Sequence, residues 1–151
     1  MTISIRAVTE ADKDIWHRMF DAYADFYNTD IPQGAHATVW KWIFDPAEKF
    51  WCAVAMNEND QLVGFTQYQL MHRSLGGSKV CYLSDLYVNP DYRGNGAGKA
   101  LIDHVFTFAK PHRISNVRWL TQEFNSDARR LYDTYMQKSD FILYSIPVEV
   151  S

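Results

Sequence analysis

The order of hydrophobic and polar positions predicts one strand and two helices at the start of the chain. Residues 3–8 alternate apolar and polar side chains, as a half-buried strand does. Residues 9–12 then have the Thr-x-x-Asp signature of a capped helix start, and apolar side chains recur at steps of three and four over residues 15–27. A second helix is expected at residues 35–44, because the Asp-Pro pair at 45–46 disfavours its continuation.

The rest of the chain alternates between strands and helices. Two runs at residues 50–56 and 62–71 are rich in aromatic and β-branched side chains and predict an antiparallel hairpin. The elements expected after it are a strand at 79–88, a helix at 97–109, a strand at 117–122, a helix at 128–136 and a last strand at 141–148. This order, β-α-α-β-β-β-α-β-α-β, is a mixed α/β arrangement without internal repeats.

Length and composition favour one domain over residues 1–151, since 47% of the side chains are hydrophobic. The apolar runs are shorter than the roughly 20 residues of a membrane span, and the N-terminus lacks the core of a secretory signal, so a cytoplasmic location without membrane contact is expected. Cys52 and Cys81 lie in predicted strands and are expected to be buried thiols. No two histidines are four residues apart, so no metal site is expected.

The net charge of −3 is unevenly distributed along the chain. Residues 1–60 contain 10 acidic and 5 basic side chains, whereas residues 61–151 contain 8 and 10. This asymmetry suits a cationic amine substrate at the front and a polyanionic cofactor at the back, although ordinary surface charge explains it equally well. Nothing in the pattern favours nucleic-acid binding.

A glycine-rich loop connects the strand at 79–88 to the helix at 97–109. Gly94, Gly96 and Gly98 lack a Cβ, so the loop can adopt positive φ and turn its N–H groups inward. The following helix directs the positive end of its dipole to the same place. A tight corner between a strand and a helix needs fewer than three glycines, so the glycine content of this loop indicates a site for a diphosphate.

Two families of nucleotide-binding loop are excluded by the flanking residues. A phosphate-binding loop of the NTPase kind has G-x-x-x-x-G-K-[ST], but Arg93 occupies the first glycine position and Ala100 replaces the hydroxyl. A dinucleotide loop has G-x-G-x-x-G early in the chain, but Lys99 occupies the third glycine position and the loop lies past the middle.

The loop resembles the acetyl-CoA loop of the GNAT superfamily of N-acetyltransferases, with Arg93, Gly96 and Gly98 at the motif positions. The resemblance extends over nearly the whole chain. It implies the GNAT fold, a central, mixed, mostly antiparallel twisted sheet flanked by four helices, with acetyl-CoA as co-substrate and no metal. The strand at 81–88, the aromatic first helix and the C-terminal segment are most similar to the diamine and polyamine branch, which includes fungal histone/polyamine enzymes. Ser84 departs from that branch, which has a glutamate there, and Met136-Gln137 replaces its Gly-aromatic pair.

The resemblance also implies which residues bind the co-substrate. The pantetheine arm is expected to pair with the strand backbone, and the loop and the start of the last helix are expected to hold the rest. These residues are Leu86, Tyr87, Val88, Arg93, Gly94, Asn95, Gly96, Ala97, Gly98, Lys99 and Asn125.

Three residues are expected to move protons. The family resemblance places Tyr132 near the sulfur of CoA as general acid, and a phenol of pKa about 10 is protonated at neutral pH. The amine needs a base, and either Asp85 or Glu123 could accept its proton directly or through water. Alternation along the strand puts Ser84 and Asp85 on opposite faces of the sheet. Cys81 as a covalent acetyl carrier is disfavoured by its place in the strand.

The leading hypothesis is therefore an acetyl-CoA-dependent N-acetyltransferase that acts directly on a primary amine of a small molecule, such as a polyamine, a diamine or an amino-acid-like compound. A protein lysine acetyltransferase and a non-catalytic acyl-CoA sensor are the alternatives. The aromatic content of 15% and the expected terminal strand suggest a homodimer.

Overall fold

Five strands form one sheet in the computed structural model, which describes residues 2–150. They are β1 (Ser4–Ala7), β2 (Phe50–Met56), β3 (Leu62–Arg73), β4 (Ser78–Val88) and β5 (Val117–Arg118). The strands lie side by side in chain order, with three antiparallel pairings and one parallel pairing between β4 and β5. The mixed, mostly antiparallel sheet predicted from the sequence is confirmed.

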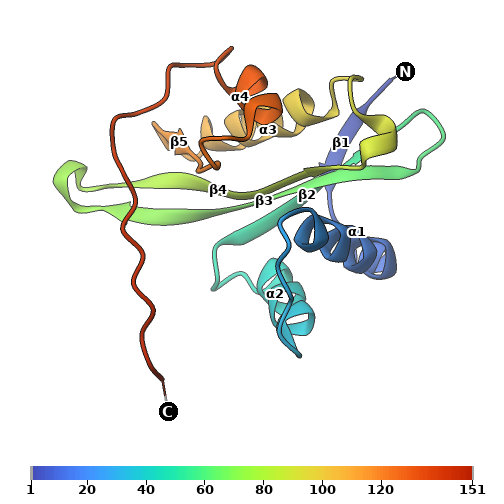
Figure 1. Ribbon diagram of the computed structural model, residues 1–151, viewed down its shortest axis with the longest axis horizontal. Helices are drawn as coiled ribbons and strands as arrows, with labels where there is room; N and C mark the ends of the chain where they lie inside the picture. The colour runs from blue at the N-terminus through green and yellow to red at the C-terminus, as the bar shows by residue number, and fades with distance from the viewer. Residues whose placement is uncertain (1, 151) are drawn as a thin grey trace. The chain divides into compact units, whose positions relative to one another are not determined.

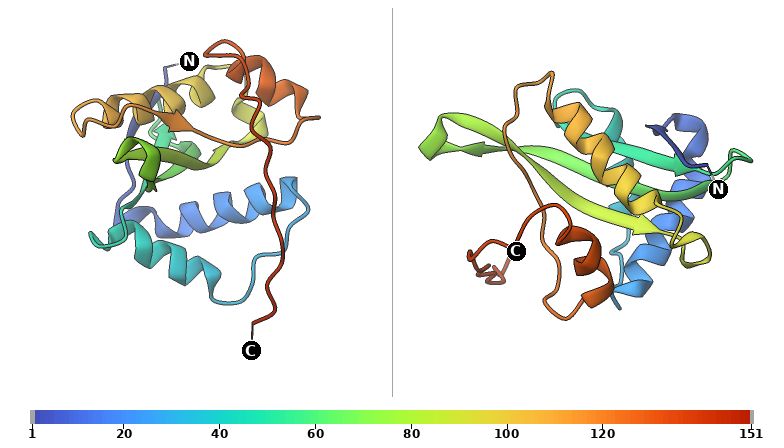
Figure 2. Two further views of the ribbon diagram at one scale, coloured as in Figure 1. Left: turned by 90° about the vertical axis from the view of Figure 1, so that its left-hand side faces the viewer. Right: turned by 90° about the horizontal axis from the view of Figure 1, so that it is seen from above.

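Three helices cover the two faces of this sheet. Helices α1 (Lys13–Phe26) and α2 (Ala35–Phe44) lie on one face and α3 (Ala97–Ala109) lies on the other, as Figures 1 and 2 show. The contacts between residues divide the chain into two units, of which the first ends at Leu120 and contains the sheet and these three helices. The second unit begins at Thr121 and contains α4 (Ser126–Tyr132).

The capping signal read from the sequence fixes a short 3-10 turn, Glu10–Asp12, that leads directly into α1. The carboxylate of Asp12 accepts a hydrogen bond from the backbone N–H of Thr9 at 2.8 Å. The Arg6 guanidinium binds the same carboxylate in a bidentate pair at 2.7 and 2.9 Å, and this hydrogen bonding lowers the pKa of Asp12. The cap therefore ties β1 to the helix that follows it.

Each face of the sheet has its own hydrophobic cluster. On the α1 face, Trp16 and Phe65 are fully buried and Tyr87 packs with them. On the α3 face, Leu101 is fully buried against Ala97 and the strand residues beside it. Because neighbouring strand residues point to opposite faces, β4 contributes side chains to both clusters.

The predicted elements near the C-terminus are shorter than expected, and one is missing. The strand expected at 117–122 ends at Arg118, because its pairing with β4 stops there. The helix expected to reach residue 136 ends at Tyr132. The strand expected at 141–148 does not form, because no strand within residues 2–150 pairs with it, and its apolar side chains are exposed. Within residues 2–150 as a whole, no helix is long and apolar enough to cross a membrane.

Candidate active site

A β-bulge interrupts β4, the fourth of the five strands. Gln67 on β3 lies opposite Asp85, whereas the next residue, Tyr68, lies opposite Leu83. Ser84 is therefore an extra residue without a partner on β3. The bulge interrupts the alternation on which the expected placement of Ser84 and Asp85 on opposite faces depends, and the Ser84 hydroxyl donates to the backbone carbonyl of Gln67 at 3.1 Å.

The Asp85 carboxylate lies on the α1 face, partly buried among hydrogen-bond donors. Gln67 donates from Nε2 to Oδ2 of Asp85 at 2.8 Å, and the hydroxyl of Tyr23 on α1 hydrogen-bonds the same carboxylate. Burial raises the pKa of Asp85, and the hydrogen bonds from Gln67, Tyr23 and Ser84 counteract only part of that effect. A carboxylate with a raised pKa is suited to accept a proton near neutral pH.

Gln67 connects this carboxylate to the first helix. Its side chain is fully buried, and its Oε1 accepts a hydrogen bond from Nε1 of Trp16 at 2.9 Å. Sequence reasoning missed Gln67, Trp16 and Tyr23 as members of the site. The available signal was a glutamine two residues after Phe65 on an inward-facing strand position, where a polar side chain must have a buried partner.

The edge of β4 that faces away from β3 is only partly covered, because β5 is shorter than β4. The parallel pairing with β5 comprises Cys81 with Val117 and Tyr82 with Arg118. Within the described residues, no strand pairs with the edge of β4 that faces away from β3 over its last six residues, 83–88. An extended ligand could pair with the backbone there, as expected for the pantetheine arm.

The strand residues predicted to bind the co-substrate have different surroundings. Tyr87 is buried in the cluster on the α1 face, whereas Leu86 and Val88 are half-buried on the α3 face. Their side chains therefore stabilise the sheet, and only their backbone groups are suited to ligand pairing.

The glycine-rich loop has the backbone that a diphosphate cradle requires. Gly94 and Gly96 have φ of 82° and 83°, which is the left-handed region. Gly96 is the N-cap residue of α3, so the first-turn N–H groups of this 13-residue helix point toward the loop. Gly98 lies inside the helix and not in the loop, so the expectation of a positive φ holds for the first two glycines and is wrong for the third.

The polar side chains of the loop are exposed and held by local contacts. The Arg93 guanidinium donates from Nε to the carbonyl of Val88 at 3.3 Å and lies 5.4 Å from the ring centroid of Phe26 at the end of α1. Asn95 donates to the carbonyl of Tyr92 at 3.1 Å, and Lys99 pairs with Asp103 at 2.7 Å. The cationic groups of Arg93 and Lys99 thus flank the loop. Ala97 is buried and packs in the core.

The remaining predicted residues belong to the second unit. Tyr132 is the last residue of α4 and is half-buried. Asn125 is the N-cap residue of α4, but its side chain makes no capping bond and instead donates to Oγ1 of Thr121 at 3.4 Å. The Glu123 side chain is exposed and lies 3.9 Å from Nζ of Lys138.

Both cysteines are free and buried, as predicted. Burial raises the pKa of the Cys81 thiol to about 11, and that of Cys52 is raised as well. A thiol of this kind is almost entirely protonated at neutral pH and is a poor nucleophile. The environment of Cys81 thus supports direct transfer over a covalent acetyl-cysteine.

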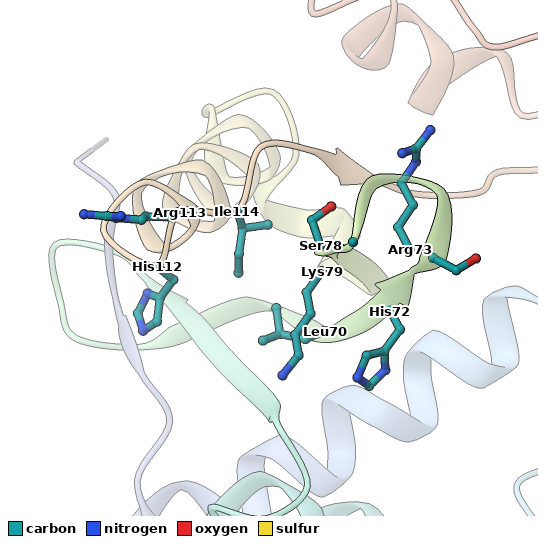
Figure 3. A pocket seen from close by; sticks show the side chains of 10 residues that line it. Leu70, His72, Arg73, Ser78, Lys79, His112, Arg113 and Ile114 are labelled. Atoms are coloured by element: carbon teal, nitrogen blue, oxygen red, sulfur yellow. The ribbon is translucent and has the colours of Figure 1, made fainter.

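One hollow of the first unit lies away from these residues. Figure 3 shows this space of about 620 Å³ at the turn between β3 and β4, the end of β4 that is remote from the glycine loop. Its lining includes His72, Lys79 and His112, and none of the predicted site residues.

Comparison with known proteins assigns the family. Residues 16–136 match the model of the Acetyltransferase (GNAT) family. The D-amino-acid N-acetyltransferase HPA3 of Saccharomyces cerevisiae is 31% identical over 143 residues, which are 94% of this chain and 89% of that protein. The peptidyl-lysine N-acetyltransferase YjaB of Escherichia coli is 32% identical over 125 residues, which are 78% and 72% of the two chains.

Solved structures show the same fold at lower identity. The structure of AAC(6')-Iy in complex with the bisubstrate analogue CoA-S-monomethyl-acetylneamine superimposes with a TM-score of 0.82. The two sequences are 19% identical, and the match covers 98% of this chain and 100% of that one. Together with the family match, which includes the bulged strand, the glycine loop and α4, these findings show that the chain belongs to the GNAT family of N-acetyltransferases.

Proposed function

We propose that this acetyltransferase transfers the acetyl group of acetyl-CoA directly to a primary amine of a small molecule, an amino-acid-like compound, a diamine or a polyamine. The observation that carries the proposal is the Asp85 carboxylate, which lies next to the bulge of β4 and has a raised pKa. The D-amino-acid substrate of the yeast relative supports a small acceptor. A stretch of 73 residues that is 34% identical to the thialysine N-epsilon-acetyltransferase of Sus scrofa supports an amino-acid-like one.

The residues present fit the co-substrate. The positive φ of Gly94 and Gly96 and the N-terminus of α3 provide inward-facing N–H donors for a diphosphate, flanked by Arg93 and Lys99. The unpaired edge of β4 provides backbone groups for the amides of the pantetheine arm. When bound, acetyl-CoA supplies an activated thioester. A backbone N–H of β4 at this edge would stabilise negative charge on the thioester oxygen.

Proton transfer is assigned to three side chains. An alkylammonium of pKa about 10.4 must lose a proton before it can attack, which costs about 5 kcal/mol near pH 7 without help. Asp85 or Glu123 accepts that proton, directly or through water, and Tyr132 donates a proton to the departing thiolate. No residue is needed as a covalent carrier, since the buried Cys81 is held protonated.

A protein lysine substrate is the second candidate, because the relative YjaB acts on peptidyl-lysine. An assay that follows release of the CoA thiol from acetyl-CoA tests the small-amine and the protein-lysine acceptors together. The panel contains D- and L-amino acids, diamines, polyamines and lysine peptides. The proposal predicts turnover with at least one free small amine. Turnover with the lysine peptides alone would overturn it.

We also propose a homodimer. The C-terminal residues of the second unit have exposed apolar side chains, among them Phe141 and Leu143, which are 91% and 69% exposed. A run of exposed apolar side chains of this kind is typical of a surface that a second copy covers. Sedimentation velocity of the full chain should give twice the monomer mass, and a monomer at micromolar concentration would contradict the proposal.

A further inference from the structure

Two histidines and an aspartate meet between α1 and α2, on the first unit. His17 and Asp21 come from α1 and His36 from α2. Oδ1 of Asp21 lies 2.8 Å from Nε2 of His36, and Oδ2 lies 3.4 Å from Nδ1 of His17. One ligand atom from each of the three residues can be chosen so that all lie within 4.8 Å of one another.

The local fold explains why these side chains converge. His17 and Asp21 are four residues apart and therefore project from the same side of α1. Gly34, with φ of 86°, is the N-cap residue of α2, so His36 lies in the first turn of that helix. The His36 ring is held edge-on to Trp16 and Phe20, with centroid distances of 6.3 and 5.5 Å.

One histidine of the cluster is held in the packed interface, whereas the other two side chains are open to solvent. The His36 side chain is only 19% exposed, whereas those of His17 and Asp21 are 48% and 51% exposed. An ion could therefore reach the carboxylate from solvent and find one imidazole already fixed.

The geometry points to a binding site for a divalent transition-metal ion, Zn²⁺ or a close analogue, formed by His17, Asp21 and His36. Two imidazoles and one carboxylate are a ligand set that such ions bind, with water in the remaining position. The ion would connect α1 to α2, the two helices that cover the Asp85 face of the sheet.

Binding requires one defined rearrangement. The rings of His17 and His36 are stacked, with centroids 3.7 Å apart and planes 10° from parallel. In this arrangement their in-plane lone pairs cannot point at one ion. The exposed His17 must turn out of the stack, and the ligand atoms must approach to about 3.4 Å, the edge of a tetrahedron with bonds of about 2.1 Å.

The sequence search for a metal site missed this set for a specific reason. The spacing signal for such a site is two histidines four residues apart, whereas here the residue four positions after His17 is an aspartate, and the second histidine comes from the next helix. Only the packing of α1 against α2 brings the three together.

Calorimetric titration of the untagged full chain with Zn²⁺ tests the site, with visible absorption of Co²⁺ as a second probe. We expect one ion per chain, and at least tenfold weaker binding for H17Q, D21N and H36Q. H72Q changes an exposed histidine outside the cluster and should bind as the unchanged chain does. Zn²⁺ at about 100 times its Kd should also raise the Tm of the unchanged chain by about 8 °C.

Two results would overturn the proposal. One is the absence of saturable Zn²⁺ binding up to about 1 mM in the unchanged chain. The other is binding by D21N and H17Q as tight as that of the unchanged chain. These two positions are half-exposed, so the test remains decisive even if H36Q fails to fold.

Discussion

Gln67 donates to Asp85 at 2.8 Å and accepts from Trp16 at 2.9 Å, so one buried amide connects the carboxylate of the bulged strand to α1. The indole N–H of Trp16 can only donate, which fixes the orientation of the amide with its NH₂ group toward Asp85. Gln67 is therefore a positioning residue for Asp85.

Replacing Gln67 by leucine should affect both stability and Asp85. Gln67→Leu keeps the volume but leaves the Trp16 N–H and one Asp85 oxygen without their buried partner, and we expect a loss of about 1–3 kcal/mol in the free energy of unfolding. The loss of a donor should raise the pKa of Asp85 further and move the acidic limb of the kcat/KM profile to higher pH. Urea unfolding and a pH–rate profile measure the two effects. A destabilised variant with an unmoved profile would contradict the positioning role.

Asp85→Asn should separate activity from stability. It removes the base but keeps an acceptor for Gln67, so kcat should fall by about 10²- to 10⁴-fold. The raised pKa means that the folded chain holds the Asp85 proton to higher pH than the unfolded chain, so the stability of the wild type falls as pH rises from about 3.9 to that raised value. The variant lacks this loss. Between about pH 4 and 8, the free energy of unfolding of the variant should rise relative to that of the wild type as the pH increases. A difference in unfolding free energy that stays constant over this range would argue against a raised pKa.

Tyr132→Phe tests the general acid. We expect kcat to fall by about 10²-fold or more with the Kd of acetyl-CoA nearly unchanged, because only the proton donor is lost. Tyr135→Phe is a matched control, since Tyr135 is also half-buried but lies after the end of α4. Equal kcat for Tyr132→Phe and wild type would remove Tyr132 from the mechanism.

Gly96 and Gly34 offer a matched pair for the cradle. Both are helix N-cap residues with φ of 83° and 86°, and a Cβ on either would meet no atom within 4 Å. Alanine at either position should thus cost a similar amount, about 1–2 kcal/mol of stability. Only Gly96→Ala should also weaken acetyl-CoA binding, by about tenfold, as measured by calorimetry. Equal affinity in the two variants would contradict the diphosphate cradle.

If no residue carries the acetyl group covalently, the thiol of Cys81 should not be needed for activity. Because the pKa of Cys81 is about 11, little thiolate exists at pH 7.5, and alkylating reagents should leave activity intact. Cys81→Ala should lose some stability by deleting a buried side chain but retain kcat within about threefold. Initial-velocity patterns should intersect. Parallel lines, or loss of turnover in a folded Cys81→Ala chain, would indicate an acetyl-cysteine.

Much of the fold follows from local patterns. The second helix has the predicted bounds, Ala35–Phe44, because an Asp-Pro pair ends it, and β2 has the predicted bounds of residues 50–56. The segment 141–148 has an equally good strand pattern, yet no strand pairs with it within residues 2–150. A strand depends on a partner that its own sequence does not specify.

The sequence predicted the candidate site residues that belong to a motif. It did not predict those whose positions depend on the pairing register of β3 and β4. The glycine loop and Asp85 were identified from the sequence, but the bulge at Ser84 comes from pairing between β3 and β4. The same bulge places Asp85 opposite Gln67, so the buried amide became visible only with the register.

The central claim, a small primary amine as acceptor, is tested most directly by competition. The enzyme would act on acetyl-CoA with a free amino acid or polyamine and a lysine peptide at equal concentration in one vessel, and mass spectrometry would give the ratio of acetylated products, which equals the ratio of kcat/KM at early times. We predict a ratio of at least about tenfold in favour of one small amine in the panel. A ratio in favour of the peptide against every small amine would contradict the account.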